Sequence, residues 1–198
     1  MNVLREATLD RVASYMASYP RRWGFAGGWA IDLFLGRVTR AHADVDIATL
    51  RPDQATLRAH LGDVEPQKVV DGKLVPWKSG EELSLPIHEL WATLPDDARL
   101  EILLNEYDAA TDEWVFRRDQ RVRRPLRRVL RKRDGMPYLA PEIVLLYKAK
   151  TLDPKNEVDF LTVLSALSDE QRAWLASALT LAHPEHPWIE RLKLSPTR

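Results

Sequence analysis

The chain has no cysteine, which excludes disulfide bonds, thiolate nucleophiles and cysteine-based zinc sites. It also lacks any run of about 18 uncharged apolar residues, the length that a membrane-spanning helix needs. The first residues, MNVLREATLDRV, do not contain the uninterrupted apolar stretch of a signal peptide. We therefore predict a cytoplasmic protein that makes no contact with a membrane.

The sequence shows no excess of charge of one sign. Lys plus Arg and Asp plus Glu number 29 each, so the total charge predicts no polyanionic partner. Hydrophobic residues make up 45%, which is ordinary for a globular protein and too high for a disordered one. A length of 198 residues allows one sizeable core, or a catalytic domain with a small helical partner.

The positive charge is nevertheless unevenly distributed. The segment 116–135, FRRDQRVRRPLRRVLRKRDG, contains ten Lys or Arg residues and two Asp residues. One interpretation of the basic run at 117–133 is a solvated face. The other is a rim that faces phosphates, either of a nucleotide or of a nucleic acid.

Apolar spacing predicts an α+β protein. Up to about residue 137, strands and helices mix, and from 138 to 198 the pattern is helical, with three helices after Ala140. Ser168 and Gln171 form a capping signature before the last of them. The main expected elements are helices over 2–19, 29–35 and from 53, and strands over 22–26, 42–50, 67–75, 84–90, 99–107 and 114–118. We therefore predict a catalytic domain over 1–137 and a helical subdomain over 138–198.

Two aspartates, Asp44 and Asp46, lie two residues apart in the strand expected over 42–50. Alternate residues of a strand project to the same side, so the two carboxylates would lie close together. A cation between them would remove their repulsion, and ligands that are all oxygen favour Mg²⁺ or Mn²⁺ over zinc. The alternative is an edge strand on which both aspartates face water.

A glycine pair, Gly27-Gly28, follows the strand expected over 22–26 and begins a helix. Backbone N–H groups are unpaired at such a position, and glycine allows a phosphate to approach them closely. The helix dipole adds to this attraction. The alternative is a tight turn that binds nothing.

The order strand, Gly-Gly, helix, Asp-x-Asp resembles the polymerase-β-like nucleotidyltransferase superfamily. The stretch AGGWAIDLFLGRVTRAHADVDIA is similar to the aminoglycoside 2″-nucleotidyltransferase group, and YLAPEIVLLYKAKTLDPKNEVDF also resembles that group. The resemblance implies the nucleotidyltransferase fold, in which helices flank a small mixed sheet and a helical subdomain follows.

The resemblance also implies a third carboxylate on a neighbouring strand and a lysine near the triphosphate. The segment RLEILLNEYD contains two candidates for this carboxylate, Glu101, our first choice, and Glu106. They are five positions apart, so Glu106 should lie on the opposite face of the strand. Lys148 matches the Tyr-Lys-Ala pattern of the group, and Lys155 is a second candidate. The expected residues are Asp44, Asp46 and Glu101 for catalysis and metal binding, and Gly27, Gly28 and Lys148 for the phosphates.

The activity implied by the resemblance is the Mg²⁺-dependent transfer of AMP from ATP to a hydroxyl of a small molecule. Aminoglycoside-type antibiotics are a candidate class of acceptor. The alternatives are a nucleotidyltransferase that modifies a protein or tRNA, as in toxin–antitoxin systems, and a nucleotide-binding module without catalysis. A monomer and a homodimer are both compatible with the resemblance.

Three further residues near the two motifs carry alternatives of their own. Asp32 lies one turn beyond Gly28 and could face the cleft or only make the helix more soluble. Arg40 and His42 precede the aspartates and could contact phosphates, anchor the carboxylates, or serve as a charged tether.

Overall fold

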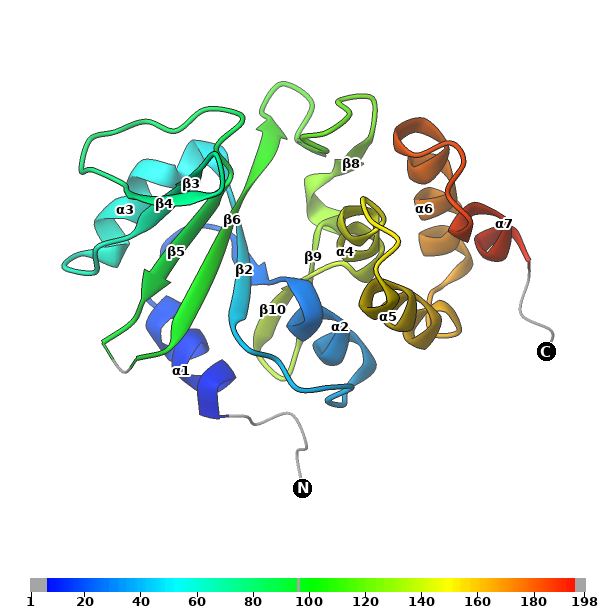
Figure 1. Cartoon of the computed structure of the whole chain (residues 1–198), viewed down its shortest axis with the longest axis horizontal. Helices are drawn as coiled ribbons and strands as arrows, with labels where there is room; N and C mark the ends of the chain where they lie inside the picture. The colour runs from blue at the N-terminus through cyan, green and yellow to red at the C-terminus, as the bar shows by residue number, and fades with distance from the viewer. Residues whose placement is uncertain (1–6, 96, 195–198) are drawn as a thin grey trace.

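A mixed β-sheet forms one half of the molecule, and helices pack on it and beside it (Figure 1). The computed structural model describes residues 7–95 and 97–194. The strand order is β4-β3-β5-β6-β2-β1-β10-β9, and β7 pairs with β6 and β8. The strands are β1 (Trp23–Phe25), β2 (Val45–Leu50), β3 (Gln67–Val70), β4 (Lys73–Pro76), β5 (Glu89–Thr93), β6 (Arg99–Asp108), β7 (Glu113–Val115), β8 (Arg123–Pro125), β9 (Leu130–Arg133) and β10 (Met136–Leu139).

The helices fall into two groups along the chain. The first group packs around the sheet, and the second lies beyond it on the right of Figure 1. The helices are α1 (Ala7–Met16), α2 (Gly27–Leu35), α3 (Gln54–Leu61), α4 (Pro141–Lys148), α5 (Pro154–Leu164), α6 (Asp169–Ala182) and α7 (Trp188–Lys193), with 3₁₀ turns at Arg51–Asp53 and Leu126–Arg128. None of the helices in the described part of the chain is long and apolar enough to cross a membrane.

The central strand β2 lies between β1 and β6. It runs parallel to β6 and antiparallel to β1. Val45 and Ile47 are fully buried, while Asp46 between them points to the opposite side and remains half-buried. This alternation is the reason why a hydrophobic strand can present a carboxylate beside the core.

The helical part is held to the rest by buried apolar surface. In α4, Ile143, Leu145 and Leu146 are completely buried, because the helix lies between α2, α5 and α6. Ser168 and Gln171 cap α6 reciprocally, as the sequence predicts. Trp188 of α7 stacks on Phe160 of α5, with ring centroids 4.3 Å apart. The helix α7 is absent from our sequence-based expectations.

Most of the expected elements before residue 120 are present, and two need correction. The strand expected over 67–75 is the hairpin of β3 and β4, because Asp71 and Gly72 both have positive φ and turn the chain. The strand expected over 84–90 is wrong except at its end, since β5 begins at Glu89. Pro86 lies in that segment and has no N–H group to donate to a sheet. The helix expected over 2–19 is α1, and residues 1–6 lie outside the described residues.

Candidate active site

A cavity with a volume of about 650 Å³ lies between the sheet and the helical part. Its walls come from the junction of β1 with α2, from β2, β6 and the segment that leads into β5, from the loop after β7, and from α4 with the turn after it. Ligand sites typically have volumes of about 300–1,000 Å³. The expected residues Gly27, Asp46, Glu101 and Lys148 all line this cavity.

Asp46 and Glu101 lie opposite each other in register on the parallel strands β2 and β6. Their carboxyl groups are hydrogen-bonded, so one of them carries a proton. Burial, and then the hydrogen bond and the negative charge of Asp46, raise the pKa of Glu101 to about 9. Burial also raises the pKa of Asp46. Two carboxyl groups that share a proton form a site that a divalent cation could occupy instead.

The strand expected from residue 42 begins only at Val45 in the structure. Asp44 therefore lies one residue before β2. Its backbone carbonyl accepts a hydrogen bond from Trp29 Nε1 at 3.0 Å. The negative charge of Asp44 raises the pKa values of both Asp46 and Glu101, so its carboxylate is close to the pair. Asp44 does not line the cavity, and within residues 7–95 and 97–194 no three Asp, Glu or His side chains form a complete set of metal ligands.

The donor chemistry of these carboxylates fits a hard divalent cation. Asp46 and Glu101 offer oxygen atoms at the cavity wall, and Asp44 adds negative charge beside them. No cysteine is available, and His42 is engaged elsewhere. Mg²⁺ and Mn²⁺ prefer such ligands, and Mg²⁺ retains several waters that would complete its shell.

Gly27 begins α2 directly against Asp46. Its φ is +54°, and a Cβ atom at this position would lie 1.8 Å from Asp46 Oδ2. The N–H of Ala26 donates to the carbonyl of Asp46 at 2.8 Å, which fixes the helix start beside the carboxylate. Ala26 provides no side-chain cap for α2. Among the described residues no side chain accepts a hydrogen bond from the first N–H groups of α2, which is the arrangement found where helices bind phosphates.

Glycine is required at position 28 for a different steric reason than at position 27. A Cβ atom there would lie 2.4 Å from His42 Cε1 and 2.6 Å from Arg40 Nη2. His42 Nε2 donates to the buried Asp32 Oδ2 at 2.6 Å, and Arg40 Nη1 donates to His42 Nδ1 at 3.1 Å. The ring of His42 also packs on Trp29, with centroids 4.2 Å apart. Asp32, Arg40 and His42 thus form a network beneath the start of α2.

Lys148, the last residue of α4, reaches the cavity as part of an ion-pair network. Its Nζ lies 2.8 Å from Asp159 Oδ2 and 3.4 Å from Asn156 Oδ1. Asp159 on α5 is 3% exposed, and its other oxygen accepts from Arg40 Nε at 3.4 Å. Asp159 therefore links this cavity-lining lysine to the network beneath α2.

The family model described as aminoglycoside-2″-adenylyltransferase matches residues 8–130, more than half of the chain. The chain belongs to this family. The family is one of adenylyltransferases, so the protein is a nucleotidyltransferase, in agreement with the resemblance described above. No curated protein matches the chain.

Solved structures of similar fold include two antibiotic-modifying enzymes. The solution structure of the antibiotic-resistance factor ANT(2″)-Ia is 17% identical, with a TM-score of 0.57 over 90% of this chain and 92% of that one. The crystal structure of lincosamide antibiotic adenylyltransferase LnuA with lincomycin is 16% identical, with a TM-score of 0.57 over 84% and 100%. ANT(2″)-Ia with adenylyl-2″-tobramycin is 16% identical, with a TM-score of 0.56 over 88% and 98%. These likenesses confirm the nucleotidyltransferase fold.

The reserve candidates lie away from the cavity of this adenylyltransferase. Glu106 accepts a hydrogen bond from Arg51 Nε at 2.7 Å and does not line the cavity. Lys155 is exposed at the start of α5, where its backbone N–H donates to Asp153. Lys150, in contrast, lines the cavity together with Lys148. The helix α4 ends at Lys148, and the turn after it brings Lys150 back to the cavity.

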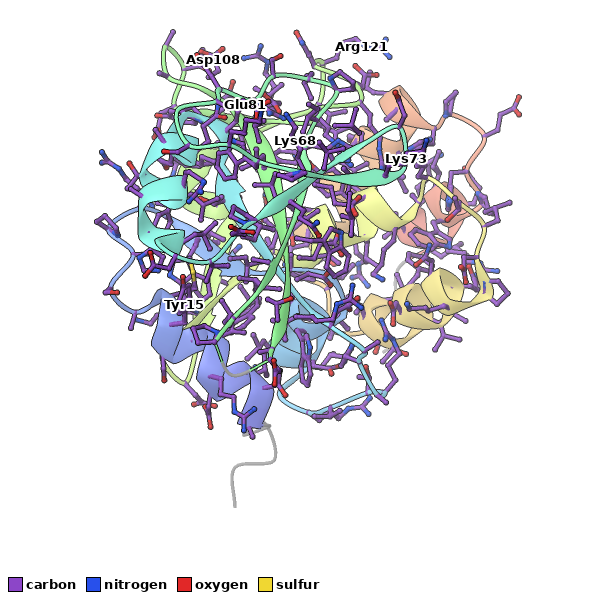
Figure 2. The ribbon with its side chains drawn as sticks, turned by 60° about the vertical axis from the view of Figure 1, so that its left-hand side comes forward. Tyr15, Lys68, Lys73, Glu81, Asp108 and Arg121 are labelled. Atoms are coloured by element: carbon purple, nitrogen blue, oxygen red, sulfur yellow. The ribbon has the colours of Figure 1, made fainter. Side chains whose placement is uncertain are left out.

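The basic run of the adenylyltransferase is mostly engaged in structural contacts. It forms β8, β9 and part of a hairpin with β10, none of which the sequence pattern had indicated. Its ion pairs join Arg121 to Asp119, Arg123 to Asp108, Arg124 to Glu142 and Arg128 to Glu170. Figure 2 shows Asp108, at the end of β6, and Arg121, on the loop between β7 and β8, at the top of that view. From this run, only Arg117 and Arg118 line the cavity among the described residues.

The sequence did not single out Asp159 or the arginine pair Arg117-Arg118 as site residues. Asp159 lies in the segment PKNEVDF, where an acidic residue on a helix is common. Its partner Arg40 is 119 positions away in the chain. The arginines are two of ten basic residues in one segment. Nothing local distinguishes the two that face the cavity from the eight that do not.

Proposed function

We propose that the protein transfers AMP from ATP to a hydroxyl of a small molecule, with Mg²⁺ as the required cation. One observation carries this proposal: the paired carboxyl groups of Asp46 and Glu101 lie in the same cavity as Gly27 and Lys148. Family membership supports it, because the family is one of adenylyltransferases.

The residues around the cavity suggest how the nucleotide would be held. The N–H groups at Gly27 and Gly28 and the ammonium of Lys148 would bind the phosphates of ATP. Asp44, Asp46 and Glu101 would hold Mg²⁺, with Mn²⁺ as a substitute. When bound, the cation neutralises charge on the triphosphate and aligns it for in-line displacement.

The transfer itself needs one bond to form and one to break. The oxygen of the acceptor hydroxyl attacks the α-phosphorus of ATP, and the bond from that phosphorus to the oxygen bridging to the β-phosphate breaks. Pyrophosphate leaves with the electron pair, and the hydroxyl proton passes to a carboxylate or to water. Glu101 either completes the ligand set or takes this proton, since its raised pKa makes its ionised form a stronger base than an ordinary carboxylate.

The family and its structural neighbours favour a small antibiotic-type acceptor. LnuA and ANT(2″)-Ia were solved with lincomycin and with an adenylylated tobramycin, respectively. A protein or tRNA acceptor is less well supported, because four of the nine arginines of the basic run are engaged in ion pairs. A non-catalytic module would have no use for two carboxyl groups buried in contact, because burial raises the pKa of both and disfavours their charged forms at a cost in stability. We further expect a cytoplasmic protein, either monomeric or homodimeric.

Pyrophosphate release with Mg-ATP tests this proposal. The panel contains tobramycin, lincomycin, a phosphorylated sugar as a small hydroxylated acid, bulk tRNA and no acceptor. It compares the wild type with Asp46→Asn and with Glu106→Gln. Glu106 is on the same strand as Glu101 but outside the cavity, so its variant controls for the loss of a carboxylate. We expect acceptor-dependent release that Asp46→Asn abolishes and Glu106→Gln retains. Failure of the folded wild type to bind Mg-ATP would contradict the proposal.

A further inference from the structure

Arg117 and Arg118 form a cationic pair at one end of the cavity. The guanidinium carbons lie 4.7 Å and 5.4 Å from the centre of the Tyr147 ring. Arg118 Nη1 also donates to the backbone carbonyl of Tyr147 at 3.0 Å. Both side chains are therefore held in place by a residue of α4, with the cavity beside them.

Their positive charge is not neutralised by the surrounding protein. Within residues 7–95 and 97–194, no carboxylate lies within ion-pair distance of either guanidinium, whereas Arg121, Arg123 and Arg124 in the same run all have one. Burial and the charge of Arg117 lower the pKa of Arg118 to about 10. Two adjacent guanidiniums that lack a carboxylate and face a cavity form a site suited to an anion.

The arginine pair is distant from the carboxylates that would hold the metal. Glu101, Leu103 and Asn105 follow one another along the cavity face of β6, and Tyr147 Oη donates to Asn105 Oδ1 at 3.1 Å. Four residues of extended strand span about 13 Å, so the arginines lie at the opposite end of the cavity from Glu101.

The opposite wall at this end is the segment that leads into β5. His88 lies there, and its pKa is lowered by burial and by the positive charges of Arg117 and Arg118. Leu85, Pro86 and Leu103 provide apolar surface around it. A ligand at this end would therefore contact two cations, one ring and several apolar side chains.

We propose that this end of the cavity binds a phosphate or carboxylate of the acceptor, so that the acceptor is a small hydroxylated acid and not a polycation. This inference rests on the function proposed above. A guanidinium pair can bind the two oxygens of such a group with parallel hydrogen bonds, and Tyr147 keeps both arginines oriented before the ligand arrives. A polycationic aminoglycoside would instead face uncompensated like charges.

Two other sources of an anion are less compatible with the geometry. The phosphates of ATP would lie near Gly27 and Lys148, at the end where Asp46 and Glu101 meet. A nucleic acid requires a longer basic track, but four of the seven arginines that continue the run form ion pairs, with Asp119, Asp108, Glu142 and Glu170. The arginine pair therefore fits a compact anion on a small molecule.

Calorimetry on the protein loaded with Mg²⁺ and a non-hydrolysable ATP analogue tests the inference, with phenyl phosphate and benzylamine as anionic and cationic probes. We expect the wild type to bind phenyl phosphate and not benzylamine. The double variant Arg117→Gln/Arg118→Gln should bind phenyl phosphate about tenfold or more weakly, since each charged hydrogen bond contributes appreciably. Arg127→Gln removes an exposed charge of the same run outside the cavity and should change nothing. Arg117→Lys/Arg118→Lys retains the charge and should recover part of the affinity.

Each contrary outcome has a distinct meaning. If the analogue binds but phenyl phosphate does not, the inference is wrong and the proposed function remains. If the double variant loses affinity for the analogue itself, the arginines serve the nucleotide, which also overturns the inference. If a bulk tRNA sample competes with phenyl phosphate and Arg127→Gln weakens that competition, the acceptor is a nucleic acid. If the analogue does not bind at all, the proposed function fails together with the inference.

Discussion

Asp46 and Glu101 face each other across the parallel pair β2 and β6, with their carboxyl groups joined by a hydrogen bond. The alternation of each strand sends these two side chains to one face while their apolar neighbours enter the core. The sheet therefore creates a site whose stability depends on how many protons, or which cation, it holds.

The first prediction concerns the pH dependence of stability without divalent cations. Glu101 has an ordinary pKa of 4.5 when unfolded and about 9 when folded, so between these values the folded state binds more protons. Stability should therefore fall as the pH rises through this window. Urea unfolding at several pH values with EDTA checks this, and Glu101→Gln should flatten the slope. Equal slopes for the two proteins would contradict the shared proton.

The second prediction is that metal binding at Asp46 and Glu101 releases a proton. A cation that binds Asp46 and Glu101 must displace the proton that they share. Calorimetric titration with Mg²⁺ at pH 7, in buffers of different ionisation enthalpy, should show release of close to one proton for the wild type. Asp46→Asn should release markedly less.

Gly27→Ala should disable the site without removing any functional group. Its Cβ would overlap Asp46 Oδ2, and the positive φ adds about 1–3 kcal/mol of backbone strain. Gly135→Ala is the matched control, because Gly135 also has positive φ but has no atom within 4 Å of its Cβ position. Both variants should lose similar stability by urea unfolding, and only Gly27→Ala should lose turnover. Equal activities would show that Asp46 can move without consequence.

Site residues that lie within one short motif could be predicted from the sequence, whereas contacts between residues far apart in the chain could not. Gly27 and Asp46 belong to short motifs with a stated physical purpose. Alternation along a strand placed Glu101 and Glu106 on opposite faces, and the resemblance to the family favoured Glu101. The network of Asp159, Arg40 and Lys148 depends on how the helical part packs, and no local pattern encodes that. The strand β8 was missed for a related reason: its Arg123 and Arg124 pair with Asp108 and Glu142, which are distant in the chain.

The KM for ATP should respond differently to substitution of Lys148 and of Lys155. Lys148 lines the cavity and is held by Asp159, whereas Lys155 is exposed outside it. Lys148→Ala should raise the KM for ATP about tenfold or more, since it removes one charged contact to phosphate. Lys155→Ala should leave it unchanged.

Asp159→Asn tests whether the network positions that lysine. The variant weakens the ion pair with Lys148 and the contact with Arg40, while the lysine itself remains. We therefore expect a higher KM for ATP with a smaller change in kcat, and a partial recovery in Asp159→Glu. A loss of stability with unchanged KM, measured by urea unfolding and pyrophosphate release, would show that Asp159 is only structural.

The buried pair Arg124–Glu142 should make the basic run essential for folding. Arg124 is 1% exposed, it lies over the Trp174 ring at 4.6 Å, and Glu142 also accepts from Gln171 Nε2 at 2.7 Å. Arg124→Met leaves the Glu142 charge buried without its ion-pair partner, which typically costs about 3–5 kcal/mol. Arg127→Gln removes an exposed arginine of the same run and should cost less than about 0.5 kcal/mol. Urea unfolding of both variants measures the difference. Similar small losses would mean that these arginines are a solvated surface and that their contacts do not hold the helical part to the sheet.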